Sequence, residues 1–127
     1  MTENGRIVLA VPSNGAGGLE CERSGHFGRC DCFTVVEIEG GAVCGVRIVA
    51  NPPHEEGGCL RPVNLLAGEG VNALVVAGIG GRPLAGFTDA GIAVYFDNTR
   101  PVVSDVIDAL LAGDVELIDP SAVCGGH

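Results

Sequence analysis

Short apolar runs alternate with glycine-rich polar segments along the first half of the chain. Residues 6–12 (RIVLAVP) form a β-branched run that reads as a buried strand. Two further apolar runs, 33–38 (FTVVEI) and 42–50 (AVCGVRIVA), flank Gly40-Gly41. Because adjacent glycines accept the positive φ angles of a two-residue turn, this pattern predicts an antiparallel hairpin.

Strands and helices alternate in the second half. Residues 72–77 (NALVVA) are apolar throughout, which indicates a strand buried on both faces, and residues 91–96 (GIAVYF) read as another strand. Helical spacing or helix-ending glycines predict helices over residues 62–70, 82–90 and 104–112. A hairpin followed by this alternation predicts a mixed sheet with helices on its faces. We find no repeat or linker, so residues 1–127 are predicted to form a single α/β domain.

Composition and charge exclude several classes of function. The net charge is −9, from 16 acidic residues against seven arginines, and such a field repels the phosphate backbone of nucleic acids. No signal-peptide pattern and no apolar run of membrane-spanning length is present, so we expect a cytoplasmic protein without a membrane partner. In that compartment the six cysteines are expected to be reduced rather than joined in disulfides.

Cys30 and Cys32 stand at the entrance to the strand predicted over residues 33–38. In an extended chain their side chains share one face, with Cα atoms roughly 6.5 Å apart. Tetrahedral zinc needs sulfur atoms about 3.8 Å apart, so a larger metal–sulfide cluster suits this spacing better. The alternative is that both are small core residues, although Arg29 and Asp31 suggest a solvent-facing end. Cys44, mid-strand, is expected in the core, and Cys21 is a weak candidate in the loop.

Histidines accompany cysteines in three glycine-rich segments. His26 lies four and six residues before two thiols, His54 and Cys59 share the segment "PPHEEGGC", and Cys124 and His127 end the chain. None of these pairs has the spacing of a closed structural zinc site.

The segment "AGIGGRP", residues 77–83, lies between a predicted strand and a predicted helix. It has no complete phosphate-loop motif, but its glycines let backbone amides approach an anionic guest. We expect the loops after residues 12, 50 and 77 to lie at one sheet edge, bringing His26 and Cys30 toward Gly80. The chain offers neither a converging carboxylate set nor a nucleophile motif, so we expect no enzymatic activity.

The order of these motifs resembles a known family. "SGHFGRC", the paired strands, "GGC" before a helix, "VVAGIGGRPLAGFTDAGIAVY" and the terminal "CGGH" are similar to the dinitrogenase iron-molybdenum cofactor biosynthesis family, which includes NifX-like proteins and the C-terminal domain of NifB-like proteins. The resemblance implies a three-layer α/β/α fold with a ribonuclease H-like motif and no nuclease activity. It also implies a carrier or scaffold for an iron-sulfur or molybdenum-containing cluster, with His26 as the leading ligand.

These expectations define a candidate site. Cluster-binding residues are expected to be His26, Phe27, Gly28, Arg29, Gly78, Gly80 and Gly81. Candidate metal ligands are His26, Cys30, Cys32, His54, Cys59, Cys124 and His127. The expected partners are the cluster and a cluster-donor or cluster-acceptor protein. The chain is expected to be a monomer or homodimer, and aerobic purification can strip the cluster from it. The alternatives are a thiol-redox or thiol-sensing protein using Cys30 and Cys32, and a non-catalytic interaction module.

Overall fold

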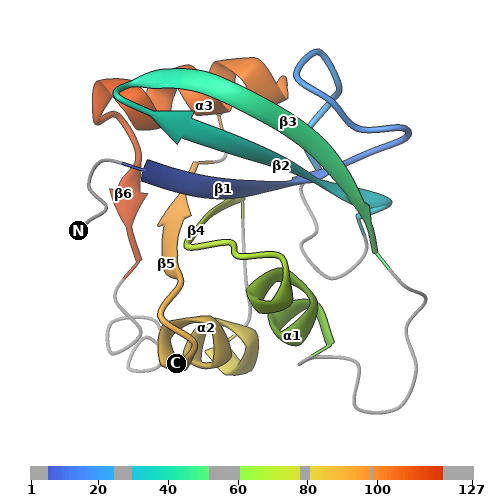
Figure 1. Cartoon of the computed structure of the whole chain (residues 1–127), viewed down its shortest axis with the longest axis vertical. Helices are drawn as coiled ribbons and strands as arrows, with labels where there is room; N and C mark the ends of the chain where they lie inside the picture. The colour runs from blue at the N-terminus through green and yellow to red at the C-terminus, as the bar shows by residue number, and fades with distance from the viewer. Residues whose placement is uncertain (1–5, 25–29, 52–60, 78–80, 98, 119–127) are drawn as a thin grey trace.

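A computed structural model describes residues 6–24, 30–51, 61–77, 81–97 and 99–118. These residues form six strands and three helices (Figure 1). In chain order they are β1 (Arg6–Ser13), β2 (Cys32–Glu39), β3 (Ala42–Ala50), α1 (Arg61–Gly68), β4 (Ala73–Val76), α2 (Gly81–Asp89), β5 (Ala93–Phe96), α3 (Val103–Ala112) and β6 (Glu116–Leu117). Among the described residues, no helix is long and apolar enough to cross a membrane.

The six strands form one mixed sheet in the order β3-β2-β1-β4-β5-β6. β2 is antiparallel to both β1 and β3, whereas β1, β4 and β5 run parallel. The strands β1, β3, β4 and β5 therefore end at the same edge of the sheet, which we call the carboxyl edge. This confirms the expected placement of the three strand ends, although the loops 52–60 and 78–80 lie outside the described residues.

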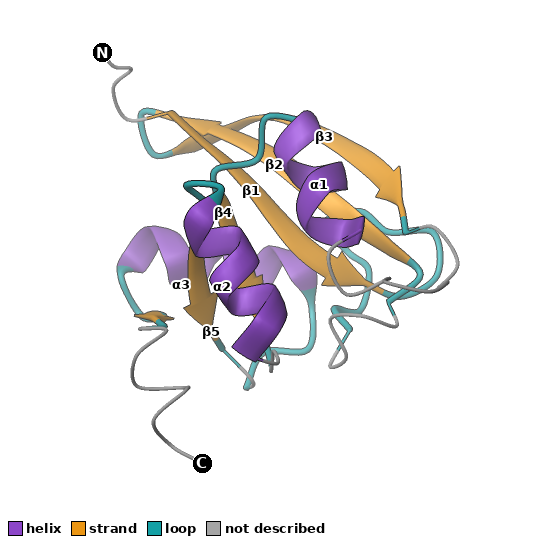
Figure 2. Cartoon of the chain, turned by 90° about the horizontal axis from the view of Figure 1, so that it is seen from below, coloured by secondary structure: helices purple, strands orange, loops and turns teal. Residues whose placement is uncertain are grey.

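Helices cover both faces of the sheet, with α1 and α2 on one side and α3 on the other (Figure 2). Val63 and Leu66 of α1 and Leu84 and Phe87 of α2 pack in one buried cluster. Val103, Val106 and Ile107 of α3 pack with alternate residues of β1, β2 and β4 in the second. The predicted mixed sheet with helices on both faces is confirmed, while the ribonuclease H-like description remains an implication of the resemblance.

Glycines end the elements where the sequence predicts. Gly40 and Gly41 have φ angles of 62° and 82° in the β2–β3 turn, and Gly113 caps α3 at a φ of 79°. These left-handed angles suit glycine because it has no Cβ atom. β6 was not predicted, since two residues are too few to show an alternating pattern.

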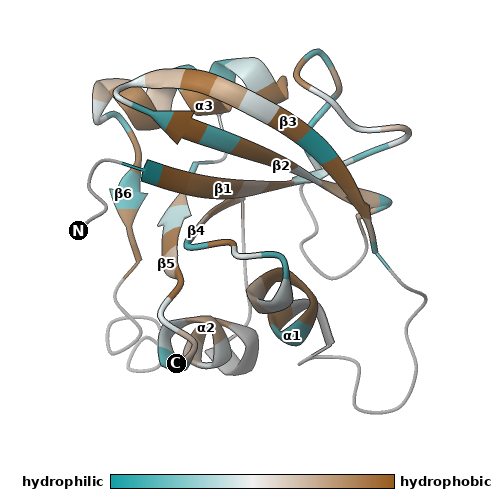
Figure 3. Ribbon diagram, in the orientation of Figure 1, coloured by the Kyte–Doolittle hydropathy of each residue, from teal (hydrophilic) through white to brown (hydrophobic). Residues whose placement is uncertain are grey.

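β3 is an edge strand that α3 does not cover. Val43, Val46 and Ile48 pair with β2 residues of the α3 face but remain 41%, 43% and 45% exposed. The hydropathy colouring shows this apolar stretch of β3 at the outside of the sheet (Figure 3). Cys44 is exposed as well, so its expected burial is wrong. An apolar run indicates a strand but does not reveal that the strand lies at an edge.

Candidate functional site

The sheet has a switch point between β1 and β4. The chain leaves β1 toward β2 on one side, whereas it leaves β4 through α2 toward β5 on the other side. In open α/β sheets, ligands bind in the crevice beyond the carboxyl ends of two such neighbouring parallel strands. The ends of β1 and β4 are therefore the first place to look for a site.

The segment after β1 folds back onto this edge. Arg23 pairs with Ser13 in an isolated antiparallel bridge, and the Ser24 amide donates to the Pro12 carbonyl at 2.8 Å. The Arg23 amide donates to the Pro101 carbonyl, also at 2.8 Å. These backbone bonds hold Arg23 between the end of β1 and the segment that precedes α3.

The Arg23 side chain reaches across the end of β4. Its Nη2 atom lies 3.2 Å from Oδ2 of Asp97, the residue directly after β5, and the Asp97 amide donates to the Val76 carbonyl at 2.9 Å. Since β4 lies between β1 and β5, the guanidinium must span the carboxyl end of β4. Arg23 and Asp97 are only 7% and 6% exposed, so a buried ion pair occupies the switch point.

Several hydrogen-bond donors surround the Asp97 carboxylate. It accepts hydrogen bonds from Thr99 Oγ1 at 3.0 Å, the Arg100 amide at 3.2 Å and Arg100 Nη1 at 2.8 Å. Burial alone would raise the pKa of Asp97, but these bonds and the charge of Arg23 outweigh burial and lower it. Burial lowers the pKa of Arg23, against the opposing attraction of Asp97. One carboxylate thus faces two guanidinium groups.

One nitrogen of Arg23 has no hydrogen-bond partner. Nη1 is the single buried side-chain nitrogen or oxygen of the described residues that lacks one. Leaving such a donor unsatisfied costs about 1–3 kcal/mol, and more for a charged group. Because buried polar groups are nearly always paired, this vacant donor needs an explanation.

Cys30 and Cys32 do not share a face of the sheet. Cys30 packs in the cluster beneath α1 and α2, whereas Cys32 alternates with Thr34 and Val36 on the α3 face. The chain bends at Asp31, whose amide donates to the Ser13 carbonyl at 3.0 Å. The expected common face is therefore wrong, because the extended conformation begins only at Cys32.

Both thiols are also buried, which agrees with the alternative that they are small core residues and not with a solvent-facing end. Cys30 and Cys32 are each 4% exposed. Burial raises the pKa of Cys30 to about 12, and burial followed by the nearby Cys21 raises the pKa of Cys32. Both are therefore protonated at neutral pH, whereas metal ligation requires a thiolate. No three His, Cys, Asp or Glu side chains in the described ranges are grouped to hold a metal ion.

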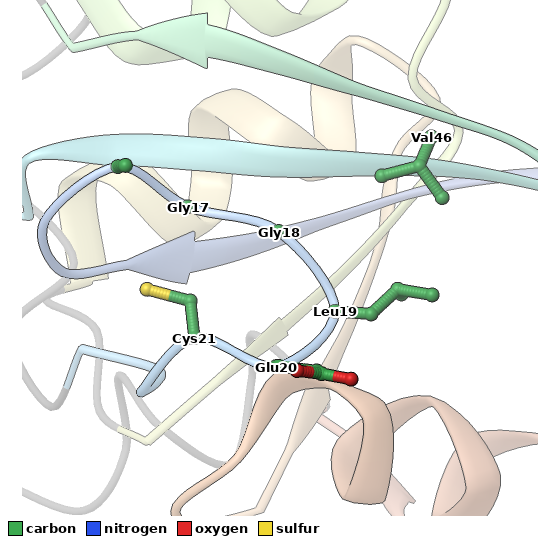
Figure 4. Close-up of a pocket in the computed structure, with 7 residues that line it drawn as sticks. Gly17, Gly18, Leu19, Glu20, Cys21 and Val46 are labelled. Carbon is green, nitrogen blue, oxygen red and sulfur yellow. The ribbon is translucent and has the colours of Figure 1, made fainter.

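The glycine-rich segment after β1 borders a shallow pocket against β3. Residues 16–21 line it together with Val46, and Leu19 and Cys21 point in different directions from the loop (Figure 4). The half-buried Cys21 thiol donates to the Asn14 carbonyl, and Cys32 Sγ lies 3.6 Å from the Gly15 carbonyl oxygen. The loop backbone therefore contacts both thiols.

Most residues of the predicted site lie outside the described ranges. They are His26, Phe27, Gly28, Arg29, His54, Cys59, Gly78, Gly80, Cys124 and His127. Gly81 begins α2. Ser24 and Cys30 flank the 25–29 segment, and the Asn51 side chain donates to the Cys30 carbonyl at 2.8 Å. The proposed roles of these residues stay predictions. The described residues that flank segments 25–29, 52–60 and 78–80 lie at the carboxyl edge, whereas β6 runs antiparallel to β5 and leads the chain before Cys124 and His127 toward the opposite edge.

Arg23 and Asp97 were not predicted as site residues. Asp97 follows the predicted strand 91–96 directly, and a polar residue in that position borders the carboxyl-edge crevice. That placement was the available signal for Asp97. Arg23 lies in a loop without periodicity, so no sequence pattern distinguishes it.

Comparisons with known proteins agree with this fold. The chain is 37% identical over 113 residues to the uncharacterised protein MJ0580 of Methanocaldococcus jannaschii, spanning 87% of this chain and 89% of that protein. The crystal structure of PH0822 has a TM-score of 0.75 at 31% identity, covering 89% of this chain and 96% of that one. The apo form of the orange protein from Desulfovibrio gigas has a TM-score of 0.76 at 24% identity, covering 93% and 96%, and supports the fold alone.

The sequence profile of the dinitrogenase iron-molybdenum cofactor family matches residues 5–113. This range includes strands β1 to β5 and all three helices. It also includes the glycine-rich sequences 13–29 and 77–83. The chain therefore belongs to the dinitrogenase iron-molybdenum cofactor family.

Proposed function

We propose that this chain is a non-enzymatic carrier or scaffold for an iron-sulfur or molybdenum-containing cluster, bound at the carboxyl edge. The observation that carries the proposal is the convergence of strand ends in a member of this family. The segments that follow β1 and β4 both leave from the switch point, where a guest can contact each of them.

The chemistry of the edge suits an anionic guest. Cluster sulfides and thiolate ligands make such a cargo negative. Arg23 and Arg100 both pair with the buried carboxylate of Asp97, and Arg100 also lies 3.9 Å from the exposed Asp114. The net charge of −9 over the whole chain disfavours nucleic acid as a competing partner. A donor or acceptor protein for the cluster is the expected macromolecular partner.

His26 is the proposed leading ligand, by its match to the family motif. Cys30 and Cys32 are second to it, because each would have to lose a proton inside the core and their side chains point to opposite faces. The same geometry disfavours the redox alternative. Two cysteines on opposite faces do not form a disulfide without backbone movement.

Anaerobic reconstitution tests the site. The purified chain is incubated with iron, molybdate and sulfide, desalted, and assayed for bound metal and absorbance. We expect the wild-type chain to take up a cluster, His26→Ala to lose most of it, and Cys30→Ser with Cys32→Ser to lose less. Cys44→Ser is the matched control, because Cys44 is exposed on the edge strand. Undiminished uptake by His26→Ala and complete loss in the double cysteine variant would reverse the assignment.

A further inference from the structure

The unsatisfied nitrogen of Arg23 lies where a guest would bind. The residue is fixed by backbone bonds at the end of β1, and its Nη2 is fixed by Asp97 at the end of β5. The remaining arm, Nη1, is buried without an acceptor in the part of the chain that the structure describes. Because the backbone and Nη2 of Arg23 are both fixed, its unpaired Nη1 is preorganised to donate to a further group.

The surrounding charges leave room for an anion. Asp97 already accepts from Arg23, Thr99 and Arg100, so its negative charge is shared between two guanidinium groups. Asp105, Asp108 and Asp114 line a surface pocket together with Arg100, and Oδ2 of Asp114, whose side chain is 60% exposed, lies 3.9 Å from Arg100 Nη2. An exposed carboxylate at that distance is screened by solvent and neutralises little of the charge on Arg100, whose own side chain is 34% exposed.

We propose that Arg23 is an anion-binding residue of the carboxyl edge, whose Nη1 donates to an oxygen or sulfide acceptor of a doubly charged guest. This deepens the proposed function by naming the group that recognises the charge of the cargo. Arg23 would complement His26: the histidine ligates metal, and the guanidinium binds an acceptor atom that is not a metal. Burial strengthens this bond, because water does not compete for the donor.

Nitrogen-15 NMR of the arginine side chains tests the proposal on the full chain. Sodium sulfate and sodium thiosulfate are titrated against sodium chloride at constant ionic strength, in the presence of reductant. The two dianions carry the same charge, but only thiosulfate offers a terminal sulfur. Arg23→Lys keeps the charge toward Asp97 and removes the second arm. Arg47→Gln is the matched control, because Arg47 pairs with Glu37 and Glu69 on another part of the molecule.

We expect the Arg23 signals to shift saturably with both dianions but not with chloride. Binding should weaken by about tenfold or more in Arg23→Lys and stay unchanged in Arg47→Gln. Tighter binding of thiosulfate than of sulfate would show that Arg23 prefers a sulfur acceptor. Equal binding would show that Arg23 accepts either dianion. Unshifted Arg23 signals in the wild-type chain overturn the proposal, whether or not Arg23→Lys folds, and so does equal binding by a folded Arg23→Lys. Because no cluster is used, this result is separate from the failure or success of cluster uptake.

Discussion

Arg23 Nη2 and Asp97 Oδ2, in residues 74 positions apart in the sequence, lie 3.2 Å apart above the end of β4. The pair joins the segment after β1 to the segment after β5. It places buried charge at the switch point of the sheet, where the chain leaves β1 and β4 in opposite directions. This ion pair therefore links the stability of the carboxyl edge to its capacity to bind an anion.

Removing the Asp97 charge should destabilise the fold. Asp97→Asn leaves the buried Arg23 guanidinium without its counter-charge, and breaking a buried pair in this way costs about 3–5 kcal/mol. The free energy of unfolding in urea at pH 7 measures the effect. Asp114→Asn is the control, since its side chain is 60% exposed and should change stability by less than about 1 kcal/mol. Equal effects of the two substitutions would show that the buried pair does not stabilise the edge.

The same carboxylate should contribute to acid sensitivity. The pKa of Asp97 is lowered in the folded chain, because its hydrogen bonds and Arg23 outweigh burial. Its stabilising contribution is complete above about pH 4, the ordinary carboxyl value, and is lost as the pH falls through the lower folded pKa. Unfolding free energies measured from pH 6 downward should fall less steeply below pH 4 in Asp97→Asn than in the wild type. An unchanged slope would assign the acid sensitivity to other groups.

The cysteines should react in the order of their exposure. Cys44 is exposed, Cys21 is half-buried, and Cys30 and Cys32 are buried. Burial raises the pKa of Cys30 to about 12, so its thiol stays in the unreactive protonated form at pH 8. Iodoacetamide at pH 8, followed by peptide mass mapping, should modify Cys44 first and Cys30 last.

The same mapping tests the thiol-redox alternative. Treatment with a mild oxidant such as oxidised glutathione should leave the peptide that contains Cys30 and Cys32 without a disulfide. A reversible loss of two hydrogens in that peptide would contradict the arrangement on opposite faces and favour the redox function.

Gly17 should be intolerant of a side chain. Its φ is 76°, and a Cβ atom there would lie 2.8 Å from Cys32 Sγ and 2.9 Å from Ile48 Cδ1. Gly17→Ala should therefore cost about 1–2 kcal/mol for the left-handed backbone and about 1–3 kcal/mol more for overpacking. Gly15→Ala is the control, because Gly15 has a φ of 66° with no atom within 4 Å. Equal unfolding free energies for the two variants would show that Cys32 does not pack against the loop.

The sequence predicts the elements whose signals are local. The Gly40-Gly41 turn, the fully buried β4 and the end of α3 at Gly113 each depend on a few adjacent residues, and each is confirmed. The predicted burial of Cys44 is wrong because β3 lies at the edge of the sheet and its register with β2 shifts at Cys44, and no local pattern contains either feature.

The site is less predictable because its contacts are distant in sequence. The bend at Asp31 depends on a bond to the Ser13 carbonyl, and it separates Cys30 from Cys32. The meeting of Arg23 with Asp97 requires the complete strand order. Sequence reasoning placed the ends of these strands at one edge of the sheet, which the strand directions confirm, but it did not identify the side chains that tertiary folding brings there.

The central claim is that the chain carries a metal cluster, and its most direct test is anaerobic isolation from the native host. Iron, molybdenum and acid-labile sulfide are measured per chain, with Arg23→Lys and His26→Ala proteins isolated in parallel. The account predicts metal and sulfide in near-stoichiometric amounts in the wild-type chain, with most of both lost in His26→Ala. A wild-type chain isolated without metal or sulfide, and unable to take up either on anaerobic reconstitution, would contradict it.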